Sequence, residues 1–231
     1  MRRSLLSACH SAILGILSPP RCAACDAPLA LDALLCEGCD DPVTPLVDEL
    51  DGGVHVVASA RYGGGIARAI SRFKYGSRPD LARLLAERVF VASTTANVAG
   101  PCVFVPVPLH PRRLALRGYN QSALLADRLA RSFGWRLRAR ALERAVNTIE
   151  QATLGREERL RNLATAIVAR EALPGAHIAL VDDVVTTGAT ALSCARALTA
   201  AGAVRVTIFA VARATAEPAA HRGEPASAAE L

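Results

Sequence analysis

The sequence predicts an α/β protein, with a parallel, Rossmann-like sheet behind a small cysteine-rich module. Between residues 54 and 212, short apolar runs alternate with amphipathic stretches, which is typical of strands and helices that alternate along a parallel sheet. Ahead of them, four cysteines stand in two Cys-x-x-Cys pairs. The 231 residues suffice for one ordinary domain and a small appendage.

Three regions are expected along the chain. Residues 1–50 are expected to form an N-terminal helix and a zinc-binding module with four cysteine ligands, and residues 51–215 the α/β domain. Residues 216–231 belong to a tail rich in Ala, Pro and Glu, which we expect to be disordered.

The first 17 residues imitate a signal peptide, because an arginine pair precedes an apolar stretch. Cys9 comes before an apolar core could form, and the apolar residues continue toward Pro19. We therefore interpret them as a short amphipathic helix. No stretch approaches the ~20 apolar residues that span a bilayer, so we expect a cytoplasmic protein that is not an integral membrane protein.

Two cysteine pairs predict a metal site. Cys22 and Cys25 form the first pair, and Cys36 and Cys39 the second. Four thiolates at this spacing suit a tetrahedral Zn²⁺, which would stabilise a module of about 50 residues that cannot bury enough surface unaided. Disulfides are the alternative, and a cytoplasmic setting disfavours them. The isolated cysteines are interpreted as buried: Cys9, Cys102 and Cys194.

The net charge of +6 is unevenly distributed. Residues 26–51 contain eight acidic residues and no basic one, whereas residues 52–231 contain 24 basic and 13 acidic residues. Such a basic domain favours an anionic partner, either a polyphosphate ligand or a nucleic acid strand. A solvated, arginine-rich surface is the alternative.

The elements of the α/β domain follow from its apolar periods. Strands are expected at 54–62, 103–108, 135–142, 178–181 and 204–212, and helices at 66–75, 79–91, 122–132 and 189–201. The polar segment 144–162 has no clean apolar period, which suits a lid that closes over phosphates or a solvated helix and loop.

The turn after the strand 178–181 predicts a site for a phosphorylated sugar. It would aim backbone N–H groups, the positive end of a helix dipole and three threonine hydroxyls at one point. Those hydroxyls belong to Thr186, Thr187 and Thr190, and Gly188 lets the backbone come close. Asp182 and Asp183 follow the strand, where carboxylates can accept from vicinal ribose hydroxyls.

The competing interpretation of this segment is the metal-holding strand of an ATPase. It requires a phosphate-binding loop of the form G-x-x-x-x-G-K-[ST]. The only lysine of the chain is Lys74, which no glycine immediately precedes. The ATPase is therefore excluded.

Several motifs together resemble the ComF-type family, an amidophosphoribosyltransferase-like family tied to natural DNA uptake. Besides the paired cysteines they are Phe73-Lys-Tyr-Gly76, Pro106-Val-Pro-Leu-His110, Arg117-Gly-Tyr-Asn-Gln121, Thr148-x-x-Gln151-x-x-Leu154, Arg159-x-x-Asn162 and Val181-Asp-Asp-Val-x-Thr-Thr-Gly188. The resemblance covers residues 13–213. It implies a type I phosphoribosyltransferase fold that binds 5-phosphoribosyl-1-pyrophosphate (PRPP) with Mg²⁺.

The resemblance also implies roles for individual residues. Asp182 and Asp183 would hold the ribose hydroxyls, and the loop around Leu109 and His110 would face pyrophosphate. The 5′-phosphate would lie on Thr186, Thr187, Gly188, Ala189 and Thr190. If catalysis occurs, Mg²⁺ and arginines would stabilise the departing pyrophosphate. The first candidates are Arg117 and Arg159. Arg112 and Lys74 are the second candidates.

One departure from the family pattern bears on the reaction. Purine-specific members of the fold often carry an acidic base three positions after the acidic pair, and this chain has Thr186 there. The acceptor is therefore unknown.

Two functions are compatible with the resemblance. The first is a PRPP-binding protein of DNA uptake that handles single-stranded DNA with partners such as a ComF-type helicase. Such partners would bring it to the inner face of the membrane. The alternative is an active phosphoribosyltransferase of nucleotide salvage or metabolism. For the first, Arg112, Arg113 and Arg117 would contact the strand, and Tyr75 and Tyr119 could stack on bases.

Overall fold

The computed structural model describes residues 20–29, 33–98, 100, 102–145 and 166–214. Three expected features lie outside the described residues and stay predictions: the helix in residues 1–17, residues 146–162 of the lid with Arg159, and the tail after residue 215. No described helix has the length and apolar character needed to cross a membrane.

A six-stranded, mostly parallel sheet forms the centre of the molecule, in the order β1-β2-β8-β7-β3-β4. Only β1 runs antiparallel to its neighbour. Its strands are β1 (Leu46–Leu50), β2 (Val54–Arg61), β3 (Val103–Pro106), β4 (Arg136–Leu137), β7 (His177–Val185) and β8 (Arg205–Arg213). The hairpin β5 (Leu142–Ala145) and β6 (Ala166–Ala169) forms a second small sheet. The predicted α/β class with a parallel sheet is confirmed.

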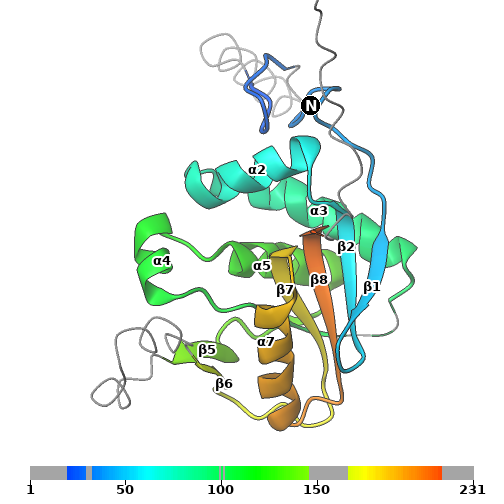
Figure 1. Ribbon diagram of the computed structural model, residues 1–231, viewed down its shortest axis with the longest axis vertical. Coiled ribbons are helices and arrows are strands. Elements are labelled where there is room, and N and C mark those ends of the chain that lie inside the picture. Colours follow the sequence, from blue (N-terminus) through cyan, green and yellow to red (C-terminus); the bar gives the residue numbers. More distant parts are fainter. Residues whose placement is uncertain (1–19, 30–32, 99, 101, 146–165, 215–231) are drawn as a thin grey trace, which may run out of the picture.

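Helices cover both faces of the sheet (Figure 1). On one face lie α2 (Gly64–Tyr75), the 3₁₀ turn η1 (Pro79–Leu81), α3 (Ala82–Thr95) and α5 (Gln121–Phe133), and on the other α7 (Ala189–Ala200). Side chains of β7 alternate between these layers: Ala179 and Val181 join the core beneath α3 and α5, whereas Ile178 and Leu180 join the core beneath α7. The alternation follows from the two-residue period of a strand that is covered on both faces.

The structure differs from the expected elements in three places. The strand expected at 135–142 is divided, because the chain leaves the main sheet after β4 and β5 pairs with β6 instead. The short helix α4 (Pro111–Arg117) was not expected, since none of its residues is buried and it has no apolar face to detect. Strand β1, in a stretch assigned to the cysteine module, pairs with β2 at the sheet edge.

The cysteine module packs on α2 and α3. Cys22, Ala23 and Leu35 are part of the same core as the apolar side chains of α2. The nearly buried Arg88 of α3 donates to the Asp40 carboxylate at 3.0 Å. A side chain at Gly65 would collide with the Cys39 carbonyl, so glycine permits this close approach. The module is therefore fixed to the helix that ends at Lys74 and Tyr75.

Candidate functional site

A cavity of about 190 Å³ lies at the carboxyl ends of β3 and β7. Open parallel sheets bind their ligands at this edge. The described lining includes six residues singled out from the sequence: Lys74, Leu109, His110, Arg117, Asp182 and Asp183. Thr190 joins it to a smaller hollow of about 90 Å³ around the turn 186–190. Most of the predicted site is therefore brought together, in two adjoining hollows.

In the acidic pair at the end of β7, Asp183 is buried and Asp182 is half-buried, and the pair is connected to α2 and α5. Lys74 Nζ lies 2.8 Å from Asp183 Oδ1, and the Asp183 side chain is only 9% exposed. Asp182 Oδ1 accepts from Ser122 Oγ at 3.0 Å and from the Asp183 amide at 2.9 Å. Burial and the charge of Asp183 raise the pKa of Asp182 to about 7, although these donors and Lys74 oppose the shift. Keeping these two carboxylates away from water costs free energy. Hydrogen bonds from the hydroxyl groups of a ligand would offset that cost.

The turn after β7 has the geometry of a phosphate cradle. Gly188 has φ of 80°, directly before α7, so the first amides of a 12-residue helix face the hollow. A Cβ at this glycine would lie 2.5 Å from Leu50 Cδ1. Arg213 donates to the carbonyl of Thr186 and, through Nε, to Asp48 Oδ2 at 2.8 Å. Strand β1 therefore supports the turn through two contacts, one apolar and one charged.

The loop between β3 and α5 carries the donors on the other side of the cavity. His110 caps α4 by accepting from the Arg112 amide at 3.2 Å. Arg113 lines the cavity, whereas Arg112 is not among its lining residues. Arg117 donates to Gln121 Oε1 at 3.0 Å and its guanidinium lies 4.7 Å from the centre of the Tyr75 ring. Of the predicted arginines in the described residues, Arg117 thus lines the cavity. Arg112 does not line it, and Arg113 lines it instead.

Two buried donors in the cavity were not predicted from the sequence as site residues. Gln121 Nε2 and Arg144 Nε have no hydrogen-bond partner among the described residues, and both residues line the cavity. Buried donors without a partner are costly, which points to oxygen atoms of a ligand. Gln121 follows the Arg117-Gly-Tyr-Asn run and could have been included. Arg144 was predicted only as the first residue of the lid segment, and the β5–β6 hairpin brings it to the cavity.

The two tyrosines considered for base stacking differ in accessibility. Tyr119 is held inward, because its hydroxyl donates to the Phe73 carbonyl at 2.5 Å and its ring packs on Phe73. Tyr75 is 74% exposed and borders a further hollow of about 370 Å³ with Arg113, Leu116 and Arg117. Only Tyr75 is therefore placed to stack on a base.

The four module cysteines can hold a metal ion. Their Sγ atoms all lie within 4.8 Å of one another, which fits tetrahedral thiolate ligation of Zn²⁺. Cys22 Sγ accepts from the amides of Ala24 and Cys36, each at 3.4 Å, and Arg68 donates to Cys39 Sγ at 3.2 Å. Such donors compensate negative charge on the sulfur atoms. The donor set thus suits a metal bound by thiolates.

Characterised proteins resemble this chain over most of its length. It is 32% identical over 203 residues to the DNA utilization protein YhgH of Escherichia coli K12, covering 83% of this chain and 89% of the relative. Competence protein F of Haemophilus influenzae is 30% identical over 220 residues, covering 92% of both chains. Competence protein ComFC of Bacillus subtilis is 32% identical over 155 residues, 66% of this chain and 61% of the relative.

The chain belongs to the ComF family. No protein-family profile matches it. Among solved structures, an allosteric regulatory enzyme of purine biosynthesis aligns with 59% of this ComF-family chain and 25% of its own, at a TM-score of 0.36 and 19% identity. The UMP synthase of Leishmania donovani aligns with 72% of this chain and 27% of its own, at a TM-score of 0.36 and 16% identity. The family assignment rests on the three sequence relatives alone.

Proposed function

We propose that this ComF-family protein binds PRPP with Mg²⁺ at the carboxyl edge of its sheet and uses that site in DNA uptake. The observation that carries the proposal is the joining of three kinds of group at one edge: the acidic pair, the phosphate cradle of α7, and the donors opposite them that have no partner among the described residues. A ribose with a phosphate at one end and a pyrophosphate at the other offers a partner to each.

The acidic pair supports the sugar end of this assignment. Asp182 and Asp183 can accept from the two ribose hydroxyls, while the 5′-phosphate lies against the amides at the start of α7. Asp183 is already paired with Lys74. When a ribose occupies the acidic pair, the ammonium is free to turn to a pyrophosphate oxygen, so that no buried charge is left without a partner.

The arginine side of the cavity supports the pyrophosphate end. Arg113 and Arg117 line it together with the loop at Leu109 and His110. Pyrophosphate oxygens also attract Mg²⁺, a cation that prefers oxygen ligands, and the only carboxylates among the described lining residues are those of the acidic pair. When bound, Mg²⁺ would neutralise charge on the pyrophosphate.

The names of the relatives extend the proposal to DNA. Two of them are called competence proteins and one a DNA utilization protein. In this chain, α4 presents Arg112, Arg113 and Arg117 with no buried residue, and Tyr75 is exposed beside Arg117. A basic surface with one accessible aromatic ring suits single-stranded DNA. We assign handling of the strand to this surface, with a ComF-type helicase as the expected partner.

An active phosphoribosyltransferase of nucleotide salvage or metabolism is the second candidate. It is favoured by the donors that would stabilise a departing pyrophosphate, Arg113 and Arg117. It is disfavoured by Thr186, an exposed residue where purine-specific members of the fold carry an acidic base. Release of pyrophosphate from PRPP with any member of a panel of bases would establish this activity.

The single lysine allows a direct test of PRPP binding. Pyridoxal 5′-phosphate forms an imine with an amine, and borohydride then reduces the imine to a stable label. We expect one label on a lysine, at Lys74, and we expect saturating PRPP with Mg²⁺ to protect it, as measured by peptide mass spectrometry. Lys74→Arg is the control that leaves only the N-terminal amine. Equal labelling with and without PRPP would contradict the proposal.

The DNA surface is tested separately by fluorescence anisotropy with a labelled oligo-dT strand. Arg112→Gln/Arg113→Gln/Arg117→Gln is expected to weaken binding roughly tenfold or more and to reduce its salt dependence. Arg83→Gln/Arg128→Gln/Arg196→Gln removes the same charge from exposed positions on α3, α5 and α7. Equal weakening by both variants would refute a specific role for α4.

A further inference from the structure

The opposite, amino-terminal edge of the sheet contains a larger cavity. It has a volume of about 640 Å³ at the starts of β3, β4, β7 and β8, within the range of roughly 300–1,000 Å³ that holds small ligands. Three glycines with positive φ stand in its rim, at Gly100, Gly134 and Gly175, and a Cβ on any of them would meet nothing within 4 Å. The rim thus leaves the cavity open.

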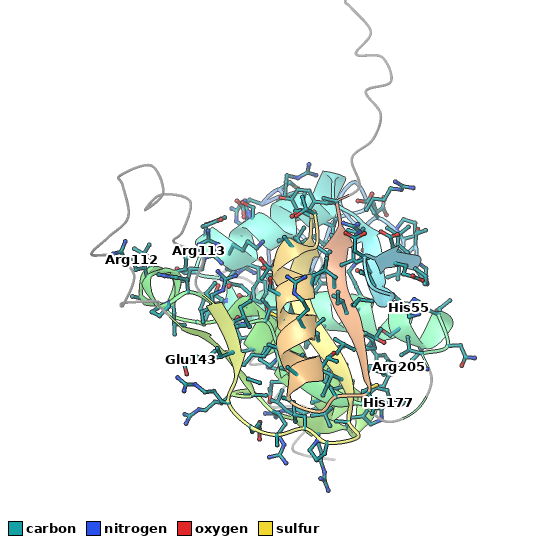
Figure 2. All side chains as sticks on the ribbon, turned by 60° about the horizontal axis from the view of Figure 1, so that its bottom comes forward. His55, Arg112, Arg113, Glu143, His177 and Arg205 are labelled. Carbon is teal, nitrogen blue, oxygen red and sulfur yellow. The ribbon has the colours of Figure 1, made fainter. Side chains whose placement is uncertain are left out.

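Three cationic or basic side chains line this cavity without partners. Arg136 begins β4, His177 begins β7 and Arg205 begins β8. His177 and Arg205 are paired in register, and Figure 2 shows them together, far from Arg112 and Arg113 on α4. No side-chain hydrogen bond or ion pair joins any of the three to another described residue, and no carboxylate is among the described lining residues. The cavity therefore favours an anion.

The spacing of these side chains favours a ligand larger than one phosphate. Arg205 and Arg136 stand on strands three places apart in the order β8-β7-β3-β4. At about 4.8 Å per strand, their backbones are about 14 Å apart. A single phosphate would engage one or two of the three side chains, whereas a phosphate with an attached sugar and ring can reach across the row.

The rest of the lining is apolar and firmly held. Trp135 is half-buried and its ring stacks on Phe133, with 4.4 Å between the ring centres. Cys102, Val103 and Ala176 continue this apolar wall. A cavity with cations along one row and an aromatic, apolar wall beside it suits a molecule that is anionic at one end and flat and weakly polar at the other.

We infer that this cavity is a second binding site, for a nucleotide, with the phosphate on the register pair His177 and Arg205 and with the sugar and base reaching toward Arg136 and Trp135. The nucleotide is either a free one or a unit of a single strand. This site shares no residue with the PRPP site, so neither proposal depends on the other.

Trp135 provides the measurement, because it is the only tryptophan of the chain. We expect AMP to change its fluorescence saturably, and Arg136→Gln/Arg205→Gln to weaken that response roughly tenfold. Both residues are exposed, and circular dichroism checks that the variant folds. Arg83→Gln/Arg128→Gln, with the same loss of charge elsewhere, should bind AMP as the unmodified protein does. Asp183→Ala, which removes the PRPP site, should also keep the response.

Further titrations distinguish the sources of the nucleotide. A response to AMP and none to oligo-dT would identify a free nucleotide, and a tighter, salt-sensitive response to oligo-dT would identify a strand. The inference is overturned if neither changes the fluorescence, if Arg136→Gln/Arg205→Gln responds as the unmodified protein does, or if inorganic phosphate binds as tightly as AMP. These results would leave PRPP binding, measured at Lys74, unaffected.

Discussion

The two edges of the sheet present their charges in opposite ways. At the carboxyl edge, charged side chains have polar partners: Lys74 pairs with Asp183, Arg213 with Asp48, and Arg117 donates to the neutral Gln121. At the amino edge, Arg136 and Arg205 are exposed and have no such partner among the described residues. Buried, paired charges are preorganised and weakly screened by salt, whereas exposed ones are strongly screened. We therefore expect a geometrically selective site at the first edge and a salt-sensitive one at the second.

The largest expected effect is the loss of PRPP binding in Asp183→Asn. The change replaces one charged acceptor oxygen, which would face a ribose hydroxyl, with an N–H donor, so affinity should fall about 100-fold or more. Isothermal titration with PRPP and Mg²⁺ measures it. Arg136→Gln/Arg205→Gln, at the other edge, should leave PRPP affinity within twofold (about 0.4 kcal/mol). Equal losses in both proteins would mean that the two edges are not independent.

We expect the cysteine module to bind Zn²⁺, and we expect removal of this ion to weaken the carboxyl edge alone. The module is fixed to α2, which ends at Lys74, so its loosening should lower PRPP affinity by roughly tenfold. A strong chelator followed by titration measures the loss, and added Zn²⁺ should restore the affinity. The AMP response of Trp135 serves as the internal reference. A chelated protein with full PRPP affinity would show that the module does not position Lys74.

Neutralising Asp182 should stabilise the ligand-free protein in a pH-dependent way. Its pKa is raised in the folded state, so the folded protein binds the proton more tightly than the unfolded one. The folded protein therefore loses stability when Asp182 is ionised. This loss of unfolding free energy is absent below about pH 4, grows as the pH rises between about pH 4 and pH 7, and is complete above about pH 7.

Asp182→Asn removes that penalty. Its gain in unfolding free energy should therefore be larger at pH 8 than at pH 5, by roughly 2 kcal/mol, while PRPP binding is lost. Urea denaturation at both pH values measures the gain. Arg205→Gln is the comparison at the amino edge and should shift stability equally at both. A gain for Asp182→Asn that does not change with pH would contradict the burial of its charge.

Glycine substitutions give the smallest expected contrast between the edges. Gly188 and Gly175 have similar positive φ values, 80° and 68°, so alanine costs each about 1 kcal/mol of backbone strain. Of these two positions, only at Gly188 would the added Cβ also collide with Leu50. This collision should lower the free energy of unfolding by roughly a further 1–2 kcal/mol. Urea midpoints for Gly188→Ala and Gly175→Ala measure the difference, and equal destabilisation would argue against the packing of β1 on the turn.

The sequence was most informative where a local pattern alone determines structure. The apolar run before Asp182, the Thr-Thr-Gly turn and the spacing of Cys22, Cys25, Cys36 and Cys39 predicted a strand, a turn into a helix and a cysteine cluster that the structure places as expected. Each depends on residues within about one element.

The remaining features depend on contacts between distant segments. Arg144 was predicted only as the first residue of the lid, and it reaches the cavity because β5 leaves the main sheet, which the sequence pattern does not indicate. Helix α4 buries none of its residues against the described part of the chain, so no apolar period marks it in the sequence. Arg113 lines the cavity and Arg112 does not, because neighbouring residues of the short helix α4 point in different directions. The amino-edge cavity assembles three side chains from separate strands, so it becomes visible only in three dimensions.

The contacts of β1 limit the length of the turn that joins it to β2. Leu50 fills the space against Gly188, and Asp48, two residues earlier, holds Arg213 beneath the same turn. Both contacts require one register against β2, which the two glycines of the connecting turn, Gly52 and Gly53, close with positive φ. Inserting or deleting one residue there would turn both side chains to the wrong face. A loop that contributes no residue to the predicted site is thus fixed in length, and designers who shorten or lengthen it should expect to alter phosphate recognition.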